Sequence, residues 1–219
     1  MEYKMDTGLV IFDLDGTLLD TLGDLTAAMN RTLTRHGLPE RTRQQMRTAL
    51  GNGARRLMEL SVPTGTDSAL FETLLAEYNA DYAAHCRIET APYPGVAALL
   101  RTLHTQGRKL AIVSNKPDEA VRALRADFFA DAVQIAVGET AAIRRKPAPD
   151  MLLAAMEQLG ADPAGTVFVG DSEVDIATAR AADLPCISVL WGFRDRDVLE
   201  RAGAQQFAAD IGELARLLD

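Results

Sequence analysis

The second half of the chain alternates short apolar runs with longer segments whose apolar residues recur at helical spacing, and this alternation restricts the fold most strongly. Strands are predicted at residues 109–113, 133–137, 166–169 and 186–190, with a helix before each one. Such alternation is typical of a parallel sheet that helices cover on both faces. The run Leu9–Phe12 is apolar at every position, which predicts a further buried strand. The sequence therefore predicts the α/β fold class.

Residues 20–90 have a different pattern, because their apolar residues recur at helical spacing without strand-like runs between them. Glycine and proline clusters such as Gly51-Asn52-Gly53 separate the predicted helices. A chain of 219 residues is long enough for a large domain with a smaller insert. We therefore expect a sheet-containing core of residues 1–19 and 91–219, interrupted by a helical domain of residues 20–90.

The charge balance limits the partners that the protein can have. The chain carries 31 acidic and 23 basic residues, a formal net charge of −8, so its surface repels nucleic acid and anionic membranes. The first residues are charged and lack the apolar stretch of a signal peptide, and no apolar run reaches membrane-spanning length. We expect a cytoplasmic protein without nucleic-acid or membrane partners. Cys86 and Cys186 are expected to be thiols, with one disulfide as the alternative.

Polar residues stand just after the predicted strands. In open parallel sheets, ligands bind at the edge formed by the carboxyl ends of the strands. The segments expected at this edge are Asp13-Leu14-Asp15-Gly16-Thr17, Ser114-Asn115-Lys116-Pro117, Arg145-Lys146-Pro147 and Gly170-Asp171-Ser172-Glu173-Val174-Asp175. Together they would bring carboxylates, a serine and two lysines to one place.

The aspartates of these segments predict a metal site. Asp13, Asp15 and Asp171 would form an oxygen-rich cluster without a nearby histidine or cysteine, which suits Mg²⁺ better than zinc. The alternative for Asp13 and Asp15 is an acidic loop at the end of a strand. The alternative for Asp175 is a helix cap, because its spacing from Ser172 resembles that of a capping box.

Two further side chains suit a phosphate group. The chain has 19 arginines but only four lysines, and two of these lysines, Lys116 and Lys146, follow core strands. Lys146 would neutralise charge on a phosphate and on a neighbouring carboxylate, with a solvated loop lysine as the alternative. The hydroxyl of Ser114 would donate to a phosphate oxygen or cap the following helix. The role of Lys116 is left open, because its side chain could be exposed to solvent.

The four segments, taken in this order, resemble the motifs of the haloacid dehalogenase-like superfamily. Each motif is weak or moderate alone, whereas the ordered set is highly specific and spans the whole chain. The helical insert resembles the cap of the subfamily that includes the phosphoglycolate phosphatases. This resemblance implies a Rossmann-like parallel sheet core with an inserted α-helical cap domain, and a Mg²⁺-dependent phosphatase.

The resemblance also implies the chemical roles of the aspartates. Asp13 is the expected nucleophile, which forms an aspartyl-phosphate intermediate. Asp15 is the expected acid and base, which protonates the leaving oxygen and then activates water. Asp13, the backbone carbonyl of Asp15 and Asp171 are the expected ligands of Mg²⁺, with Thr17 and Asp175 as supporting residues.

Phosphate binding and substrate choice follow from the same resemblance. Ser114, Asn115 and Lys146 are expected to hold the phosphoryl oxygens. The segment Leu50–Arg56 resembles the cap loop that meets the substrate in phosphoglycolate phosphatases, with a helix-to-helix turn as the alternative. The candidate specificity residues in this loop are Asn52, Arg55 and Arg56.

The expected substrate is a small phosphorylated metabolite such as phosphoglycolate, bound by a monomer or a homodimer. An inorganic pyrophosphatase and a β-phosphoglucomutase-like mutase are the enzymatic alternatives. A non-enzymatic receiver domain, which accepts a phosphoryl group, is the alternative from another class. The acid at Asp15 argues against a dehalogenase, and the absence of lysine from residues 20–90 argues against a phosphonatase.

Overall fold

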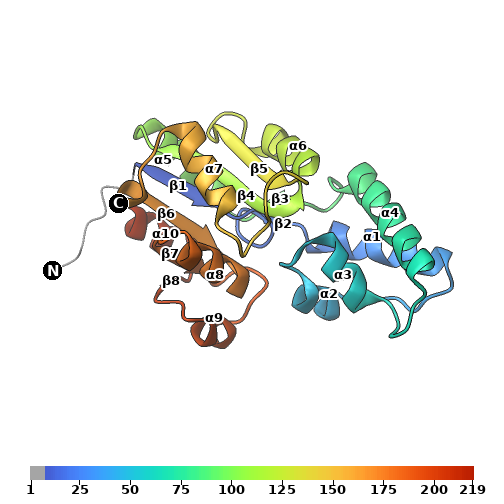
Figure 1. Ribbon diagram of the computed structural model, residues 1–219. Helices are drawn as coiled ribbons and strands as arrows, with labels where there is room; N and C mark the ends of the chain where they lie inside the picture. Colours follow the sequence, from blue (N-terminus) through green and yellow to red (C-terminus); the bar gives the residue numbers. More distant parts are fainter. Residues whose placement is uncertain (1–7) are drawn as a thin grey trace. The chain divides into compact units, whose positions relative to one another are not determined.

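The computed structural model describes residues 8–219, which divide into two compact units (Figure 1). The first unit contains residues 8–19 and Pro92–Asp219, and the second contains Asp20–Ala91. The expectation about a signal peptide falls in part on residues 1–7, which lie outside the described residues.

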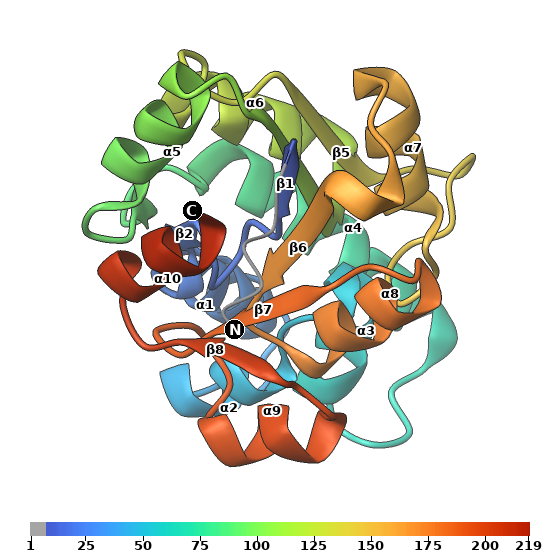
Figure 2. The same ribbon diagram turned by 90° about the vertical axis from the view of Figure 1, so that its left-hand side faces the viewer.

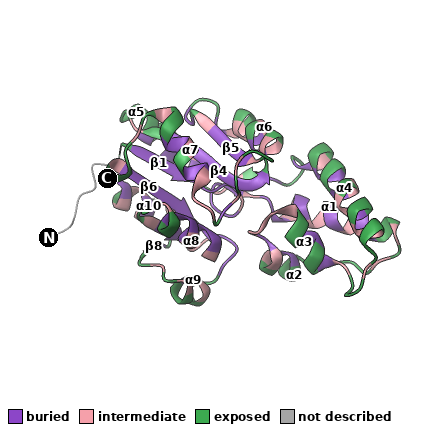
Figure 3. Cartoon of the chain, viewed as in Figure 1, coloured by how far each residue is buried: buried purple, intermediate pink, exposed green. Residues whose placement is uncertain are grey.

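A six-stranded parallel sheet forms the centre of the first unit, in the order β5-β4-β1-β6-β7-β8. The strands are β1 (Leu9–Phe12), β4 (Lys109–Pro117), β5 (Ile135–Glu139), β6 (Thr166–Gly170), β7 (Cys186–Val189) and β8 (Gln206–Ala208). All four residues of β1 are buried, which explains why this run is apolar at every position (Figure 3). The predicted α/β fold with a parallel sheet is confirmed.

Helices cover both faces of this sheet. They are α5 (Val96–Thr105), α6 (Asp118–Phe128), α7 (Asp150–Leu159), α8 (Glu173–Ala181), α9 (Arg196–Ala202) and α10 (Ile211–Leu218), with a short 3₁₀ helix at Pro163–Gly165. Figure 2 shows α5 and α10 on one side of the sheet and α7 and α8 on the other. This arrangement buries the strands on both faces and leaves their ends for polar residues.

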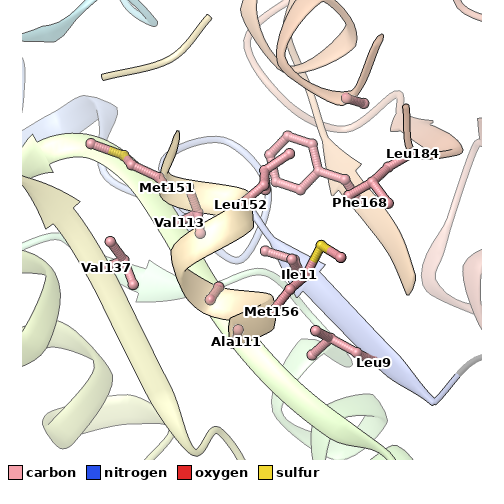
Figure 4. Close-up of a cluster of buried hydrophobic side chains, with 12 residues drawn as sticks. Leu9, Ile11, Ala111, Val113, Val137, Met151, Leu152, Met156, Phe168 and Leu184 are labelled. Carbon is pink, nitrogen blue, oxygen red and sulfur yellow. The ribbon is translucent and has the colours of Figure 1, made fainter. Parts of the chain in front are cut away.

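The hydrophobic core beneath α7 fixes the central strands (Figure 4). Leu9 and Ile11 of β1 contribute to this core, together with Phe168 of β6 and with Met151 and Met156 of α7. Leu9 and Ile11 are two residues apart, so they share one face of the strand. Truncating a buried side chain of this kind to alanine costs about 2–5 kcal/mol of stability.

The register of the sheet brings the strand ends to one level. Phe12 of β1 is paired with Ile112 of β4 on one side and with Val169 of β6 on the other. Asp13 and Asp171 follow the ends of β1 and β6, and Ser114, Asn115 and Lys116 lie in the last part of β4 at the same edge of the sheet. This edge is where the candidate site residues converge.

The second unit is helical. Its helices are α1 (Leu22–Arg35), α2 (Arg43–Ala49), α3 (Gly53–Ser61) and α4 (Ser68–His85). In α1, Leu22, Leu25, Met29 and Leu33 recur at helical spacing and are buried, and this helix packs against α4. A capping box formed by Thr42 and Gln45 begins α2.

Several elements differ from the sequence prediction. Strand β5 begins two residues later than predicted, at Ile135, and ends at Glu139. Strand β8 and helices α9 and α10 were not predicted. Two short strands, β2 (Leu19–Asp20) and β3 (Ala91–Pro92), pair with each other where the chain passes between the two units. Strands β2 and β3 have two residues each, which is too few for a clear apolar pattern.

Candidate active site

Three buried aspartates form the centre of the candidate site. Asp13 follows β1, Asp171 follows β6, and Asp175 lies in the first turn of α8. Each offers a carboxylate oxygen, and these oxygens lie within 4.8 Å of one another. A single cation can therefore contact all three carboxylates. The cluster contains only oxygen donors, and this composition fits a hard divalent cation.

Lys146 lies inside this aspartate cluster. Its Nζ donates to Asp13 Oδ1 at 2.6 Å and to Asp175 Oδ1 at 2.7 Å. The ammonium also lies 5.6 Å from the centroid of the ring of Phe168, a residue of β6. The side chain of Lys146 is 3% exposed, so it is not the solvated loop lysine that the sequence left as the alternative.

Negative charge exceeds positive charge within the cluster. Burial and the neighbouring carboxylates raise the pKa of Asp13 well above its usual value, although Lys146 opposes this shift. Burial and the charge of Asp175 raise the pKa of Asp171 to about 7. Burial alone would lower the pKa of Lys146, but the carboxylates of Asp13 and Asp175 raise it instead. These shifts indicate that the cluster holds its lysine charged and favours further positive charge.

The carboxylate of Asp15 lies outside the three-aspartate cluster and is paired with Lys116. The Nζ of Lys116 lies 3.1 Å from Asp15 Oδ1, and Lys116 is buried. Ser114 donates from Oγ to Asp15 Oδ2 over 3.5 Å, and it accepts from the backbone N–H of Lys116 at 3.3 Å. The sequence left open whether Lys116 is exposed, and the structure places it against the candidate acid.

Asn115 fixes the backbone of Lys146. Its Oδ1 accepts from the N–H of Lys146 at 2.8 Å, and its Nδ2 donates to the carbonyl of Lys146 at 3.0 Å. The peptide bond between Lys146 and Pro147 is cis. The sequence assigned Asn115 to phosphate oxygens, whereas its side chain binds the segment that carries the lysine. This contact joins segments 31 residues apart.

Asp175 caps α8, which is the alternative that the sequence offered for it, and its carboxylate also contacts Lys146. Its Oδ2 accepts from the N–H and the Oγ of Ser172 at 3.1 and 2.6 Å, in the capping box that begins α8. Its Oδ1 accepts from Lys146. A Cβ on Gly170 would lie 2.4 Å from the Cβ of Asp175, so only glycine fits before Asp171 without a shift.

Asp171 also contacts two loops, the segment after β1 and the loop after β7. Thr17 donates from Oγ1 to Asp171 Oδ1 over 3.5 Å. In the loop after β7, the N–H of Phe193 donates to Asp171 Oδ2 at 2.6 Å, and Trp191 Nε1 donates to the carbonyl of Thr17 at 3.1 Å. The sequence analysis missed this loop. Its position directly after a predicted strand, and its possession of the only tryptophan, were signals that could have identified it.

The candidate specificity residues lie in the helical unit. Asn52 occupies the N-cap position of α3 without a side-chain capping bond. Arg55 donates from both terminal nitrogens to Glu72, at 2.8 Å each, and Arg56 donates to Glu59 at 2.9 Å. These ion pairs are exposed to solvent, so each contributes little to stability.

Neither Cys86 nor Cys186 forms a disulfide, as the sequence predicted. Burial raises the pKa of Cys186 to about 12, which makes this thiol unreactive. Over residues 8–219, no helix combines the length and the apolar character required to cross a membrane.

Comparisons with known proteins agree with the fold and identify the family. The profile described as haloacid dehalogenase-like hydrolase matches residues 10–189. A phosphoglycolate phosphatase of Pseudomonas putida is 36% identical over 195 residues, which cover 84% of this chain and 70% of that protein. An N-acetylmuramic acid 6-phosphate phosphatase of Pseudomonas aeruginosa is 33% identical over 218 residues, which cover 99% of this chain and 96% of that protein.

A solved structure has the same fold over its whole length. It comes from Lactobacillus delbrueckii subsp. bulgaricus and is described as a phosphoglycolate phosphatase by prediction. Its TM-score is 0.92 at 34% sequence identity, and the alignment covers 99% of both chains. The family match includes all four motif segments, so the resemblance inferred from the sequence is confirmed and the non-enzymatic receiver is set aside. This chain is an enzyme that belongs to the haloacid dehalogenase-like hydrolase family.

Proposed function

We propose that this enzyme is a cytoplasmic, Mg²⁺-dependent phosphatase that hydrolyses a small phosphorylated metabolite through an aspartyl-phosphate intermediate. The observation that carries the proposal is the cluster of three buried carboxylates, two of which contact the buried ammonium of Lys146. A dianionic phosphate cannot approach a carboxylate unless cations screen both groups. The excess negative charge of the cluster supports the binding of a divalent cation where the phosphate must arrive.

The metal ligands proposed are Asp13, Asp171 and the backbone carbonyl of Asp15, with Asp175 in a supporting position. Mg²⁺ bound there would supply Lewis-acid stabilisation of the phosphoryl oxygens and would neutralise the carboxylates. Thr17 supports this set through its hydrogen bond to Asp171. The raised pKa values of Asp13 and Asp171 support the same set, because the burial and repulsion that favour a proton on these carboxylates also favour a bound cation.

Asp13 is the proposed nucleophile. One carboxylate oxygen attacks phosphorus as the bond to the leaving oxygen breaks, and an aspartyl-phosphate forms. Asp15 donates a proton to the leaving oxygen and later removes a proton from the water that releases phosphate. The ion pair with Lys116 and the contact with Ser114 support this role, because they restrain the Asp15 carboxylate beside the nucleophile.

Ser114, Asn115 and Lys146 are proposed to bind the phosphoryl group. Lys146 contributes an ammonium that already contacts Asp13, so it can neutralise the nucleophile and the incoming phosphate together. Ser114 contributes a hydroxyl that lies near Asp15. The side-chain contacts of Asn115 support a contribution through the placement of Lys146.

The unit Asp20–Ala91 is proposed to act as a cap domain that selects the substrate, with Asn52, Arg55 and Arg56 as candidate contacts. The relatives are named for phosphoglycolate and for N-acetylmuramic acid 6-phosphate, and both compounds are phosphate esters of organic acids. The substrate class proposed is therefore a phosphomonoester that also carries a carboxylate.

Phosphoglycolate is the first candidate substrate. N-acetylmuramic acid 6-phosphate is the second, and it is favoured by the relative that matches nearly the full length of both chains. Hydrolysis of inorganic pyrophosphate and transfer of phosphate within a sugar are the remaining alternatives, and the oligomeric state is open between monomer and homodimer.

A phosphate-release assay tests the proposal. Purified enzyme is incubated with Mg²⁺, or with a chelator, and with phosphoglycolate, N-acetylmuramic acid 6-phosphate, pyrophosphate or hexose 1-phosphates. We expect Mg²⁺-dependent release of phosphate from at least one of the phosphorylated acids. Release that is unaffected by the chelator, or no release from any compound, would contradict the proposal. Conversion of a hexose 1-phosphate to its 6-phosphate without phosphate release would favour the mutase.

A further inference from the structure

We propose that the β7–α9 loop, residues 190–195, positions Asp171 for metal binding through Trp191, Gly192 and Phe193. The inference rests on the metal site of the proposed function. It adds a fifth segment to the four that the sequence indicated. Residues that orient metal ligands from outside the ligand set commonly change metal affinity about 10-fold to 100-fold when they are altered.

The backbone of the loop binds the Asp171 carboxylate directly. The N–H of Phe193 donates to Oδ2 at 2.6 Å, and both residues are buried. This bond restricts rotation of the carboxylate group, because one of its two oxygens is held in place. Thr17 approaches Oδ1 from the opposite segment, so the carboxylate lies between the two contacts.

Trp191 joins the loop to the segment that carries the candidate nucleophile. Its Nε1 donates to the carbonyl of Thr17 at 3.1 Å, across 174 positions in the sequence. Thr17 in turn contacts Asp171. The loop therefore ties the segment after β1 to the segment after β6, and these two segments supply Asp13 and Asp171.

Gly192 permits the close approach of the loop to both segments. A Cβ at this position would lie 2.4 Å from the Cβ and from Oδ2 of Asp171, and 2.5 Å from the carbonyl oxygen of Gly16. Gly192 is not among the described glycines with positive φ, so the requirement for glycine is one of space alone. Any side chain here would displace Asp171 or the segment after β1.

The far end of the loop is fixed by an ion pair. Arg194 is buried and donates from Nε and a terminal nitrogen to Glu173, at 2.7 and 3.1 Å. Glu173 begins α8, two residues beyond Asp171. The loop is thus held at both ends, with its glycine against the metal-binding carboxylate.

The test compares two glycine-to-alanine variants by calorimetric titration of the metal-free enzyme with Mg²⁺. Gly192→Ala places a methyl group against Asp171. Gly8→Ala is the control, because its Cβ would meet only the carbonyl oxygen of Gly165 at 3.7 Å. We expect Gly192→Ala to weaken Mg²⁺ binding about 10-fold or more, and Gly8→Ala to retain wild-type affinity.

A second variant, Trp191→Phe, keeps an aromatic ring and removes the N–H that binds Thr17. We expect it to weaken Mg²⁺ binding roughly 2-fold to 10-fold, the range that corresponds to one hydrogen bond. This variant also decides the question if Gly192→Ala does not fold. Melting temperatures of the metal-free variants are measured alongside.

Wild-type Mg²⁺ affinity in Trp191→Phe, or in a folded Gly192→Ala, would overturn the inference. A lower melting temperature of the metal-free protein together with unchanged Mg²⁺ affinity would show that the loop has only a structural role. If the wild-type enzyme itself bound no Mg²⁺, the proposed function would fail together with this inference. Failure of the loop proposal alone is therefore distinguishable.

Discussion

Buried aspartates occur in both units of the chain, but the two units neutralise them in opposite ways. In the helical unit, Asp81 of α4 is 2% exposed and accepts from Arg31 at 2.5 Å and from Arg35 at 2.8 Å. His85 lies 3.5 Å from the same carboxylate. Although burial opposes the shift, the hydrogen bonds from the two arginines lower the pKa of Asp81.

At the sheet edge the ratio of carboxylates to cations is reversed, because the cluster holds three carboxylates and the ammonium of Lys146 contacts two of them, Asp13 and Asp175. Burial and mutual repulsion raise the pKa values of Asp13 and Asp171. The comparison teaches that burial alone does not mark a functional aspartate. A carboxylate with enough cationic partners stabilises the fold, whereas a cluster that lacks positive charge is a candidate for binding a cation.

The largest expected effect is on kcat, which a substitution at the sheet edge should lower and one in the helical unit should not. Asp13→Asn should lower kcat by more than about 1,000-fold, because an amide cannot serve as the nucleophile. Asp81→Asn is the matched control and should retain wild-type kcat at a temperature where it is folded. Steady-state phosphate release measures both. A near-normal rate for Asp13→Asn would contradict the assignment of the nucleophile.

The free energy of unfolding should change in the opposite order, with the larger loss in the helical unit. Asp81→Asn should destabilise the protein by about 2–3 kcal/mol, because it weakens charged hydrogen bonds to two arginines. Asp171→Asn in the metal-free protein should leave stability unchanged or increase it, because it removes one of the repelling carboxylates. Urea denaturation with a chelator present measures both. Equal destabilisation by the two variants would remove the distinction between the regions.

The pH dependence of stability should differ for the two regions. The pKa of Asp171 is raised in the folded protein to about 7, so its contribution to stability is present at low pH and is lost as pH rises through about 7. The pKa of Asp81 is lowered, so its contribution is present above its ordinary value near 3.8 and is lost as pH falls below it. The metal-free protein should therefore be most stable between these two values.

Melting temperatures measured from about pH 2 to about pH 9, with a chelator or with Mg²⁺, check this expectation. Mg²⁺ should reduce the loss of stability that accompanies the rise of pH toward 7, because the cation replaces the protons on the cluster. Mg²⁺ should leave the loss of stability below about pH 3.8 unchanged, because protonation of Asp81 causes that loss. If the melting temperature of the Asp171→Asn variant fell by the same amount as pH rose toward 7, another group would be the cause.

The smallest expected effect concerns the helical unit's candidate contact with the substrate. Arg55→Ala should raise KM for a phosphorylated acid roughly 2-fold to 10-fold with little change in kcat, if the guanidinium binds the substrate carboxylate. Arg196→Ala, which also removes an exposed ion pair, serves as the control. If the exposed pair with Glu72 is the only role of Arg55, KM will remain at the wild-type value.

The sequence predicted the positions of the core acidic residues because parallel strands end at a common edge. Asp13 and Asp171 could be placed together without knowing any long-range contact. Lys146 was identifiable because this chain uses lysine rarely.

The remaining features depend on contacts that no local pattern reveals. The amide of Asn115 binds the backbone of Lys146, and Trp191 binds the carbonyl of Thr17 at the opposite end of the chain. Lys116 is buried, and its ammonium pairs with Asp15, a residue about 100 positions away. Asp81 stands within a helix and has the local pattern of a surface residue, although helix packing buries it.

Calorimetric titration of the metal-free enzyme with Mg²⁺ tests most directly whether the sheet-edge cluster binds a cation. The wild-type protein is predicted to bind Mg²⁺ at a single site, and Asp171→Asn is predicted to lose this binding. The Asp81→Asn variant should bind Mg²⁺ as the wild type does. Wild-type affinity in Asp171→Asn, or no binding by the wild-type protein, would contradict the account.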